Sequence, residues 1–157
     1  MRIAFGVDPG GWELREGVLA HLKEAGHEVI EVGTTDMDNA IPYMIVGKNV
    51  AEEVTGGRAD FGVVMCGTGV GISMAANKNK GARCCFAQSY YIARDSRVVN
   101  NANIIALGAT TTSLRMANEM IDVFLATEWG EGLPQFRVDR IKSGAAGFAA
   151  FEEEQFK

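Results

Sequence analysis

The chain has 157 residues, of which 47% are hydrophobic and 22% charged, and its formal net charge is −5. This length and composition fit a single globular domain. The negative charge disfavours nucleic acid and anionic membranes as partners, and no apolar run approaches the ~20 residues of a membrane span. Because the sequence opens without a secretory signal and its three cysteines lack the spacing of zinc ligands, we expect a cytoplasmic protein with reduced thiols.

Strand-like and helix-like segments alternate in the first half of the chain. Short apolar runs predict strands over residues 3–7, 28–32 and 61–65. Helices are expected over residues 12–25 and 42–55, and a third helix is expected to end near residue 77. In the first of them, Leu14, Val18 and Leu22 repeat at four-residue spacing, which is typical of a helix face packed on a core.

The alternation continues in the second half, with strands predicted over residues 82–86 and 104–107 and helices over residues 90–99 and 113–126. From residue 129 onward the pattern is less regular. Residues 138–141 and 148–156 are expected to be helical or to form an arm that reaches a second subunit. We therefore assign residues 1–141 to one domain and residues 142–157 to a C-terminal tail that contacts another subunit.

Five strand–helix units in so short a chain predict an α/β domain, with one parallel sheet covered by helices on both faces. In such folds, ligands bind beyond the carboxyl ends of the strands. The loops to search for a site begin at Asp8, Gly33, Cys66, Ala87 and Gly108.

The turn from Cys66 to Gly71 carries the strongest chemical signal. Its thiol follows a buried strand directly and lies where the next helix begins, so that backbone N–H groups there favour a thiolate. Three glycines let the backbone approach a ligand closely, and Thr68 adds a hydroxyl beside the thiol. These groups suit a thiolate base with donors for a developing oxyanion. An inert cysteine in a tight turn explains the same residues about equally well.

Other patterns in the sequence are weaker. The run from Gly67 to Gly71 lacks the spacing of dinucleotide and phosphate-loop motifs, which makes a nucleotide-binding domain a minor alternative. Asp8, at the end of the first strand, can orient a substrate hydroxyl or cap a turn. Four residues with reactive side chains are expected to be structural: Cys84, Cys85, His21 and His27.

Several segments together resemble the ribose-5-phosphate isomerase B family, which includes the galactose-6-phosphate isomerase subunits. They are residues 66–78 (CGTGVGISMAANK), the opening IAFGVD, the segment Asn100–Asn103, and Arg137 with Val138. The resemblance covers about residues 1–141. It implies a single-domain, three-layer α/β/α fold of Rossmann type around a five-stranded parallel sheet. It also implies a homodimer, often paired into a tetramer, with active sites at the subunit interface and neither a metal nor an organic cofactor.

The resemblance also implies roles for particular residues. Cys66 is then the base that carries a proton between C1 and C2 of a sugar phosphate through a cis-enediol, and Thr68 helps to cradle the enediolate. Asn100 matches a substrate-binding asparagine, and Arg137 matches a phosphate-binding arginine. The other residues expected to bind substrate are Asp8, Tyr43, Gly67, Gly69, Val70, Gly71 and Asn77.

Three departures from the family pattern bear on the substrate. Pro9 replaces a histidine that helps to bind the sugar, Val99 replaces the histidine that opens a furanose ring, and Leu133 replaces a second phosphate-binding arginine. Because valine cannot transfer a proton, the sequence keeps the proton-transfer residues but has lost ring-opening and phosphate-binding groups.

The sequence leaves two substrate classes open for an aldose–ketose isomerase. A pentose 5-phosphate is the family default. An erythrose or erythrulose 4-phosphate fits the loss at Val99, because a four-carbon aldose blocked at its terminal oxygen cannot close a furanose. A non-catalytic sugar-phosphate-binding subunit is a further alternative, although the retained Cys66 and Thr68 favour an enzyme.

Overall fold

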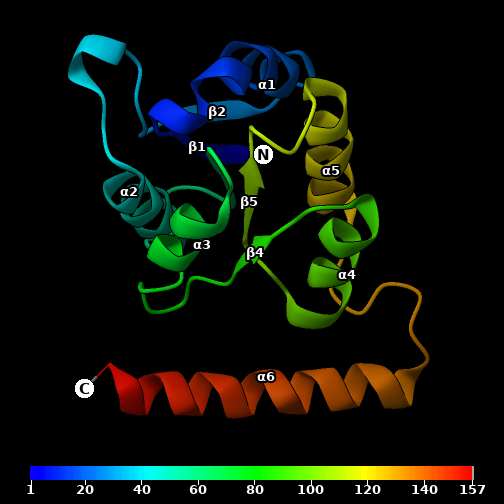
Figure 1. Ribbon diagram of the computed structural model, residues 1–157. Coiled ribbons are helices and arrows are strands. Elements are labelled where there is room, and N and C mark those ends of the chain that lie inside the picture. Colours follow the sequence, from blue (N-terminus) through cyan, green and yellow to red (C-terminus); the bar gives the residue numbers. More distant parts are fainter. Residues whose placement is uncertain (157) are drawn as a thin grey trace.

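Five parallel strands form the centre of the molecule in a computed structural model that describes residues 1–156 (Figure 1). The strands are β1 (Arg2–Val7), β2 (Glu28–Glu31), β3 (Phe61–Cys66), β4 (Cys84–Phe86) and β5 (Ile104–Gly108), and their order is β2-β1-β3-β5-β4. The parallel sheet expected from the sequence is therefore confirmed. Because β3 lies between β1 and β5, the loops that follow these three strands meet at one edge of the sheet, which we call the carboxyl edge.

Helices cover both faces of the sheet and give the expected three layers. One face carries α2 (Tyr43–Thr55) and α3 (Val70–Ala76), and the other carries α1 (Trp12–Glu24), α4 (Tyr90–Asn100) and α5 (Leu114–Ala126) (Figure 1). Two short 3-10 turns, Pro9–Gly11 and Met37–Asn39, follow β1 and β2. The fold class is therefore α/β, as predicted.

Alternating side chains along β1 explain why the sheet has a core on each face. Phe5 and Val7 are buried in the cluster that includes Leu22 of α1, whereas Ala4 is buried in the opposite cluster with Val50 of α2. Successive residues of a strand point to opposite faces, so a strand that is apolar throughout fits only between two layers of helices.

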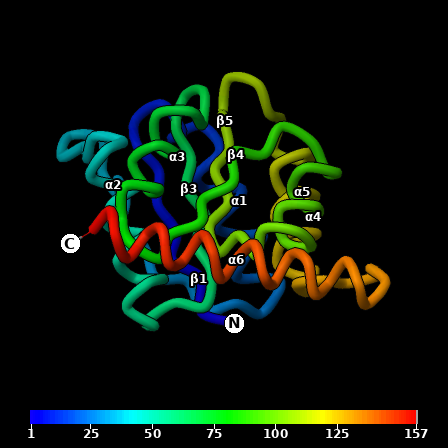
Figure 2. Tube along the Cα trace, turned by 90° about the horizontal axis from the view of Figure 1, so that it is seen from below, coloured from blue at the N-terminus to red at the C-terminus, as the bar shows by residue number. Residues whose placement is uncertain are grey.

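The tail forms one continuous helix, α6 (Gln135–Gln155), which lies beside the edge strand β4 and runs from the side of α4 to the side of α3 (Figure 1, Figure 2). The less regular tail expected from the sequence is therefore a single helix, in which alanine and glutamate favour helix and Pro134 immediately precedes its first turn. No residue of α6 is buried. Since α6 runs through residues 141 and 142, the division of the chain there stays a prediction. Among residues 1–156, no helix is both long enough and apolar enough to cross a membrane.

A buried arginine fixes the corner between α4 and β5. Arg97 is 7% exposed, and its guanidinium donates hydrogen bonds to Asn101 Oδ1 at 3.0 Å and to the Ala102 carbonyl at 2.6 Å while lying over the Phe61 ring. Asn101 has a φ of 50°, in the left-handed region that asparagine tolerates better than most residues. The backbone on either side of Asn100 is therefore held in place from the interior.

Candidate active site

The turn from β3 into α3 holds the Cys66 thiol against the backbone. Cys66 is the last residue of β3, and Gly69 has a φ of 82°, which lets the chain turn sharply into α3. The Gly69 N–H donates a hydrogen bond to Cys66 Sγ at 3.1 Å. The thiol is free and only 6% exposed. A backbone donor aimed at sulfur suits a thiolate, which accepts hydrogen bonds and donates none.

The loop after β5 clamps the carbonyl side of this turn. The Ala109 N–H donates to the Cys66 carbonyl at 2.9 Å, and both the N–H and the hydroxyl of Thr110 donate to the Gly67 carbonyl, at 2.9 and 2.7 Å. The turn therefore cannot shift without breaking three hydrogen bonds. The Thr68 side chain is left exposed beside the thiol, where its oxygen accepts a long hydrogen bond of 3.4 Å from Val70 N–H.

The loop after β1 packs against the other side of the same turn. The Asp8 N–H donates to the Met65 carbonyl at 3.2 Å, and a Cβ added at Gly10 would lie 2.5 Å from the Gly67 nitrogen. Only glycine allows so close an approach of two backbones. The Asp8 carboxylate accepts a hydrogen bond from Gly11 N–H at 3.0 Å, which lowers the pKa of the carboxyl. Burial has the larger effect, and the pKa of Asp8 is raised overall.

Tyr43 forms a wall of the site on the side of α2. A Cβ added at Gly71 would lie 3.0 Å from the Tyr43 ring, so the ring packs directly on the first turn of α3. The ring is 40% exposed, as is Val70 beside it. An aromatic side chain in this position can pack against a bound sugar while its hydroxyl remains available for a hydrogen bond.

The structure thus brings most of the predicted site residues together at the carboxyl edge. These residues are Asp8, Tyr43, Cys66, Gly67, Thr68, Gly69, Val70 and Gly71. Asn77 does not join them within the chain, because α3 carries it to the opposite end of the sheet. There its side chain exchanges two hydrogen bonds with the backbone of Cys84, at 2.9 and 2.8 Å. This pairing holds the start of β4 to the end of α3.

Asn100 and Arg137 also lie away from Cys66 within the chain. Asn100 ends α4 and is exposed, and Arg137 is exposed in the first turn of α6. With Val99, Asn100 lines a cavity of about 680 Å³ between the domain and α6. Asn100 lies at the end of the sheet opposite the carboxyl edge, and this end is called the amino edge below.

The other reactive side chains have structural surroundings. Burial raises the pKa of both the Cys84 and Cys85 thiols, so these thiols stay protonated near neutral pH. His21 lies on α1, and its Nε2 is 2.6 Å from Asp122 Oδ1 of α5. Within residues 1–156, no three His, Cys, Asp or Glu side chains gather as metal ligands would.

Two residues that shape the site escaped the sequence analysis. Thr110 secures the Gly67 carbonyl, and Gly10 permits the contact between the two loops. The sequence did indicate the loops that begin at Asp8 and Gly108. The packing of strands that are distant in the chain decides which residue of each loop touches the turn. No local sequence pattern indicates that residue.

Comparison with known proteins agrees with this geometry. Residues 3–141 match the sequence profile of a family described as Ribose/Galactose Isomerase. The chain belongs to this family. Over 140 residues it is 40% identical to ribose-5-phosphate isomerase B of Escherichia coli K12, with 89% of this chain and 93% of that protein covered. The structure of ribose-5-phosphate isomerase B from Clostridium thermocellum superimposes with a TM-score of 0.89 at 37% identity, covering 99% of both chains.

A third relative shares the whole length of the chain. It is the 4-deoxy-4-sulfo-D-erythrose isomerase of Clostridium sp. MSTE9, which is 30% identical over 157 residues, with 100% of this chain and 99% of that protein covered. The family resemblance found in the sequence is confirmed, and the chain is an isomerase of the sugar-phosphate isomerase type.

Replacing Asp8 by asparagine is expected to separate activity from stability. Asparagine keeps an oxygen for the Gly11 N–H but removes a partly buried charge. Since burial raises the folded-state pKa of Asp8, the ionised carboxylate disfavours folding at neutral pH. We expect Asp8→Asn to lower kcat/KM at least tenfold, because the Asp8 carboxylate is predicted to orient a substrate hydroxyl. Its Tm at pH 7 should equal or exceed that of the wild type, with the difference shrinking as the pH falls and Asp8 becomes protonated.

Thermal unfolding of both proteins from pH 4 to 8 measures this difference in Tm. A Tm of Asp8→Asn well below that of the wild type at pH 7 would contradict the prediction.

Proposed function

We propose that the chain is an aldose–ketose isomerase that moves the carbonyl of a short sugar between C1 and C2, with Cys66 as the base. The observation that carries the proposal is the hydrogen bond from Gly69 N–H to Cys66 Sγ at the carboxyl edge, beside the exposed Thr68. A buried thiol that merely filled space would need neither a backbone donor nor a hydroxyl next to it.

The proposed reaction needs only one proton carrier and stabilisation of one oxyanion. The Cys66 thiolate removes the proton from C2 of the aldose, and the electron pair moves to the C1 oxygen, which gives a cis-enediolate. The proton of the C2 hydroxyl passes to the neighbouring C1 oxygen, the C2 oxygen forms the new carbonyl, and C1 takes the first proton back from sulfur. The Thr68 hydroxyl and the backbone of Gly67–Gly71 lie where they can donate to the charged oxygen. No electrons leave the sugar, so no redox partner is required.

The substrate that fits best is an open-chain, four-carbon aldose with an anionic end. Val99 cannot shuttle the proton that ring opening requires, and its side chain lines the cavity beneath α6. The full-length similarity to a 4-deoxy-4-sulfo-D-erythrose isomerase also favours a four-carbon substrate. A four-carbon sugar whose terminal position bears a phosphate or a sulfonate cannot form a furanose. The loss of an arginine at Leu133 fits a terminal group of lower charge, while a pentose 5-phosphate is the alternative.

We further propose that a second copy of the chain completes the site. Asn100 lies at the amino edge and Arg137 lies in the first turn of α6, but Cys66 lies at the carboxyl edge of the sheet. A dimer that brings the amino edge of one copy to the carboxyl edge of the other would place Asn100 and Arg137 on the substrate. The exposed side chain of Asn100 remains available for such a contact.

Replacing Cys66 by alanine is expected to abolish turnover while leaving the fold intact. General-base catalysis is typically worth ~10²–10⁴ in rate, and no other thiol or imidazole lies in the turn. Solvent deuterium exchange into four- and five-carbon sugar phosphates measures the proton-transfer step directly. The matched variant Cys85→Ala should retain activity. A Cys66→Ala protein that keeps near wild-type kcat would exclude this mechanism, and a wild type that binds these sugars without exchange would identify a binding subunit.

The substrate proposal predicts a ranking of kcat/KM values. Erythrose 4-phosphate and 4-deoxy-4-sulfoerythrose should each be turned over more efficiently than ribose 5-phosphate by the wild type. In Val99→His, the value for ribose 5-phosphate should rise, because imidazole can serve ring opening near neutral pH. Val99→Gln is the matched polar control and should not raise it. If ribose 5-phosphate is the best substrate of the wild type, another residue or water must open the ring.

The shared site predicts that two inactive variants restore activity when mixed. In a mixed dimer of Cys66→Ala and Asn100→Ala, one site carries both substitutions and the other carries neither. Random exchange of equal amounts should therefore restore about a quarter of the wild-type activity. Cys66→Ala mixed with Cys66→Ser is the control and should stay inactive. Absence of recovery after verified subunit exchange would show that each chain builds its site alone.

A further inference from the structure

The loop between β5 and α5 contacts two successive carbonyls of the turn after β3. The Gly67 carbonyl accepts hydrogen bonds from the N–H and from the hydroxyl of Thr110, at 2.9 and 2.7 Å. The Thr68 carbonyl lies against Gly108, where an added Cβ would overlap its oxygen. Both carbonyl oxygens are therefore on the side of the turn that faces the β5 loop.

The direction of each carbonyl fixes the direction of the N–H in the same peptide unit. In a trans peptide the two groups point in opposite directions, and residues 1–156 contain no cis peptide bond. The Thr68–Gly69 unit shows the result, because its carbonyl lies on Gly108 while its N–H, that of Gly69, donates to Cys66 Sγ. The carbonyl of the preceding unit, Gly67–Thr68, faces the same loop. The Thr68 N–H is therefore directed to the thiol side of the turn.

The Thr68 N–H is a backbone donor without a partner beside the candidate base. Within residues 1–156 it has no hydrogen-bond acceptor, whereas the Gly69 N–H next to it binds sulfur. A donor of fixed direction stabilises an oxygen on which charge develops during a reaction. Because a hydrogen bond weakens steeply as it departs from linearity, the effect depends on how accurately the N–H is aimed.

We propose that Thr110 is a positioning residue for the isomerisation, whose hydroxyl holds the Gly67 carbonyl so that the Thr68 N–H points at the charged oxygen of the enediolate. The inference rests on the proposed function of the Cys66 turn. The Thr110 N–H alone restrains the Gly67 oxygen along one direction. The hydroxyl adds a second donor, which keeps the Gly67–Thr68 unit from rotating about that first bond.

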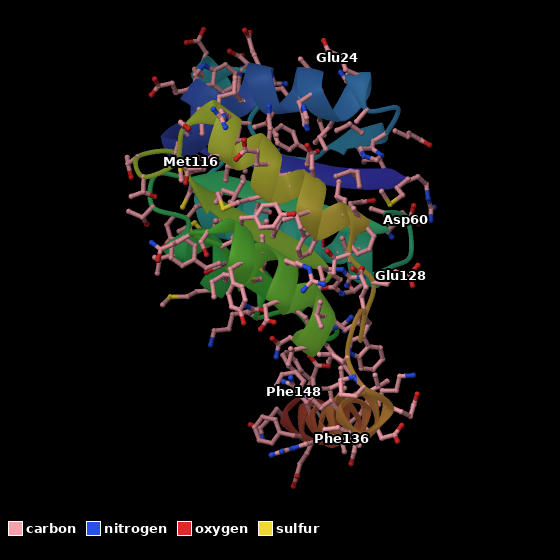
Figure 3. All side chains as sticks on the ribbon, turned by 90° about the vertical axis from the view of Figure 1, so that its right-hand side faces the viewer. Glu24, Asp60, Met116, Glu128, Phe136 and Phe148 are labelled. Atoms are coloured by element: carbon pink, nitrogen blue, oxygen red, sulfur yellow. The ribbon has the colours of Figure 1, made fainter. Side chains whose placement is uncertain are left out.

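The surroundings of the contact leave this task to Thr110. The hydroxyl of the neighbouring Thr111 donates to the Gly108 carbonyl at 3.3 Å, within its own loop, and makes no hydrogen bond to the turn after β3 in the described residues 1–156. Figure 3 shows Met116, in the first turn of α5 after this loop, well away from Phe136 and Phe148 of α6. The C-terminal helix therefore takes no part in the contact.

Replacing Thr110 by valine removes the hydroxyl and keeps the backbone N–H. The kinetic constants are measured with whichever of erythrose 4-phosphate and ribose 5-phosphate the wild type turns over faster. We expect Thr110→Val to lower kcat about tenfold, as for the loss of one hydrogen bond of ordinary strength in the transition state. KM should stay within about twofold, because the aimed donor acts on charge that develops after the sugar has bound.

Two further variants separate the hydroxyl from the shape of the loop. Thr110→Ser keeps the hydroxyl and should retain most of the wild-type kcat. Thr111→Val makes the same substitution at the next position, and as the matched control it should leave kcat and KM unchanged. A wild-type kcat in Thr110→Val, a serine variant as slow as the valine variant, or an equal loss in Thr111→Val overturns the proposal.

The pH dependence of Cys66 alkylation distinguishes positioning of one peptide unit from a general loosening of the turn. The N–H that binds sulfur belongs to the Thr68–Gly69 unit, which packs on Gly108 and not on Thr110. The rate of alkylation by iodoacetamide, followed at the Cys66 peptide by mass spectrometry, should therefore have the same pH profile in Thr110→Val and in the wild type. A displaced profile would show that the whole turn has moved, and it overturns the positioning role.

Failure of this inference is distinguishable from failure of the proposed function. If Cys66→Ala keeps the wild-type rate of deuterium exchange, Cys66 is not the base and both proposals fail. If Cys66→Ala is inactive while Thr110→Val is as fast as the wild type, only the role of Thr110 fails.

Discussion

The close contact between the loops after β1 and β5 and the turn after β3 is the constraint on which the site depends. Two backbones meet at Gly10 and Gly67, and Thr110 and Ala109 bind the carbonyls of the same turn from the other side. The contact exists because β3 is the middle strand of the sheet, with β1 and β5 as its neighbours. The thiol of Cys66 is therefore positioned by three strands and not by its own turn alone.

The parallel sheet also explains why one chain has the predicted site residues at two ends. Every strand begins at the amino edge and finishes at the carboxyl edge, so the end of a helix returns the chain to the start of the next strand. Cys66 ends a strand, whereas Asn77 and Asn100 end helices. In a fold of this kind such residues cannot meet inside one chain. The proposed site between two copies would use both ends.

The sequence predicts those features that depend on local pattern. Short apolar runs located all the strands, helical spacing of apolar residues and turn signals located the first five helices, and the glycine-rich turn at Cys66 indicated the edge where the candidate site lies. It did not predict that Asn77 pairs with the backbone of Cys84, because a side-chain amide in a motif looks the same whether it binds a ligand or a strand. Nor did it predict one continuous α6, since a helix that buries no residue has no apolar stripe to detect.

The hydrogen bonds that Arg97 donates have a consequence for how this family can diversify. The conformation of the corner after α4 is set from inside, by the guanidinium of Arg97 and the left-handed turn at Asn101. The side chain at position 99 contributes nothing to that network of hydrogen bonds, so its chemical nature can change without altering the path of the backbone. An imidazole, an amide or an alkyl group can be accommodated there by a single codon change. Under the proposed role of this position in ring opening, the range of sugars can therefore change through the residue before Asn100 at little cost to the fold.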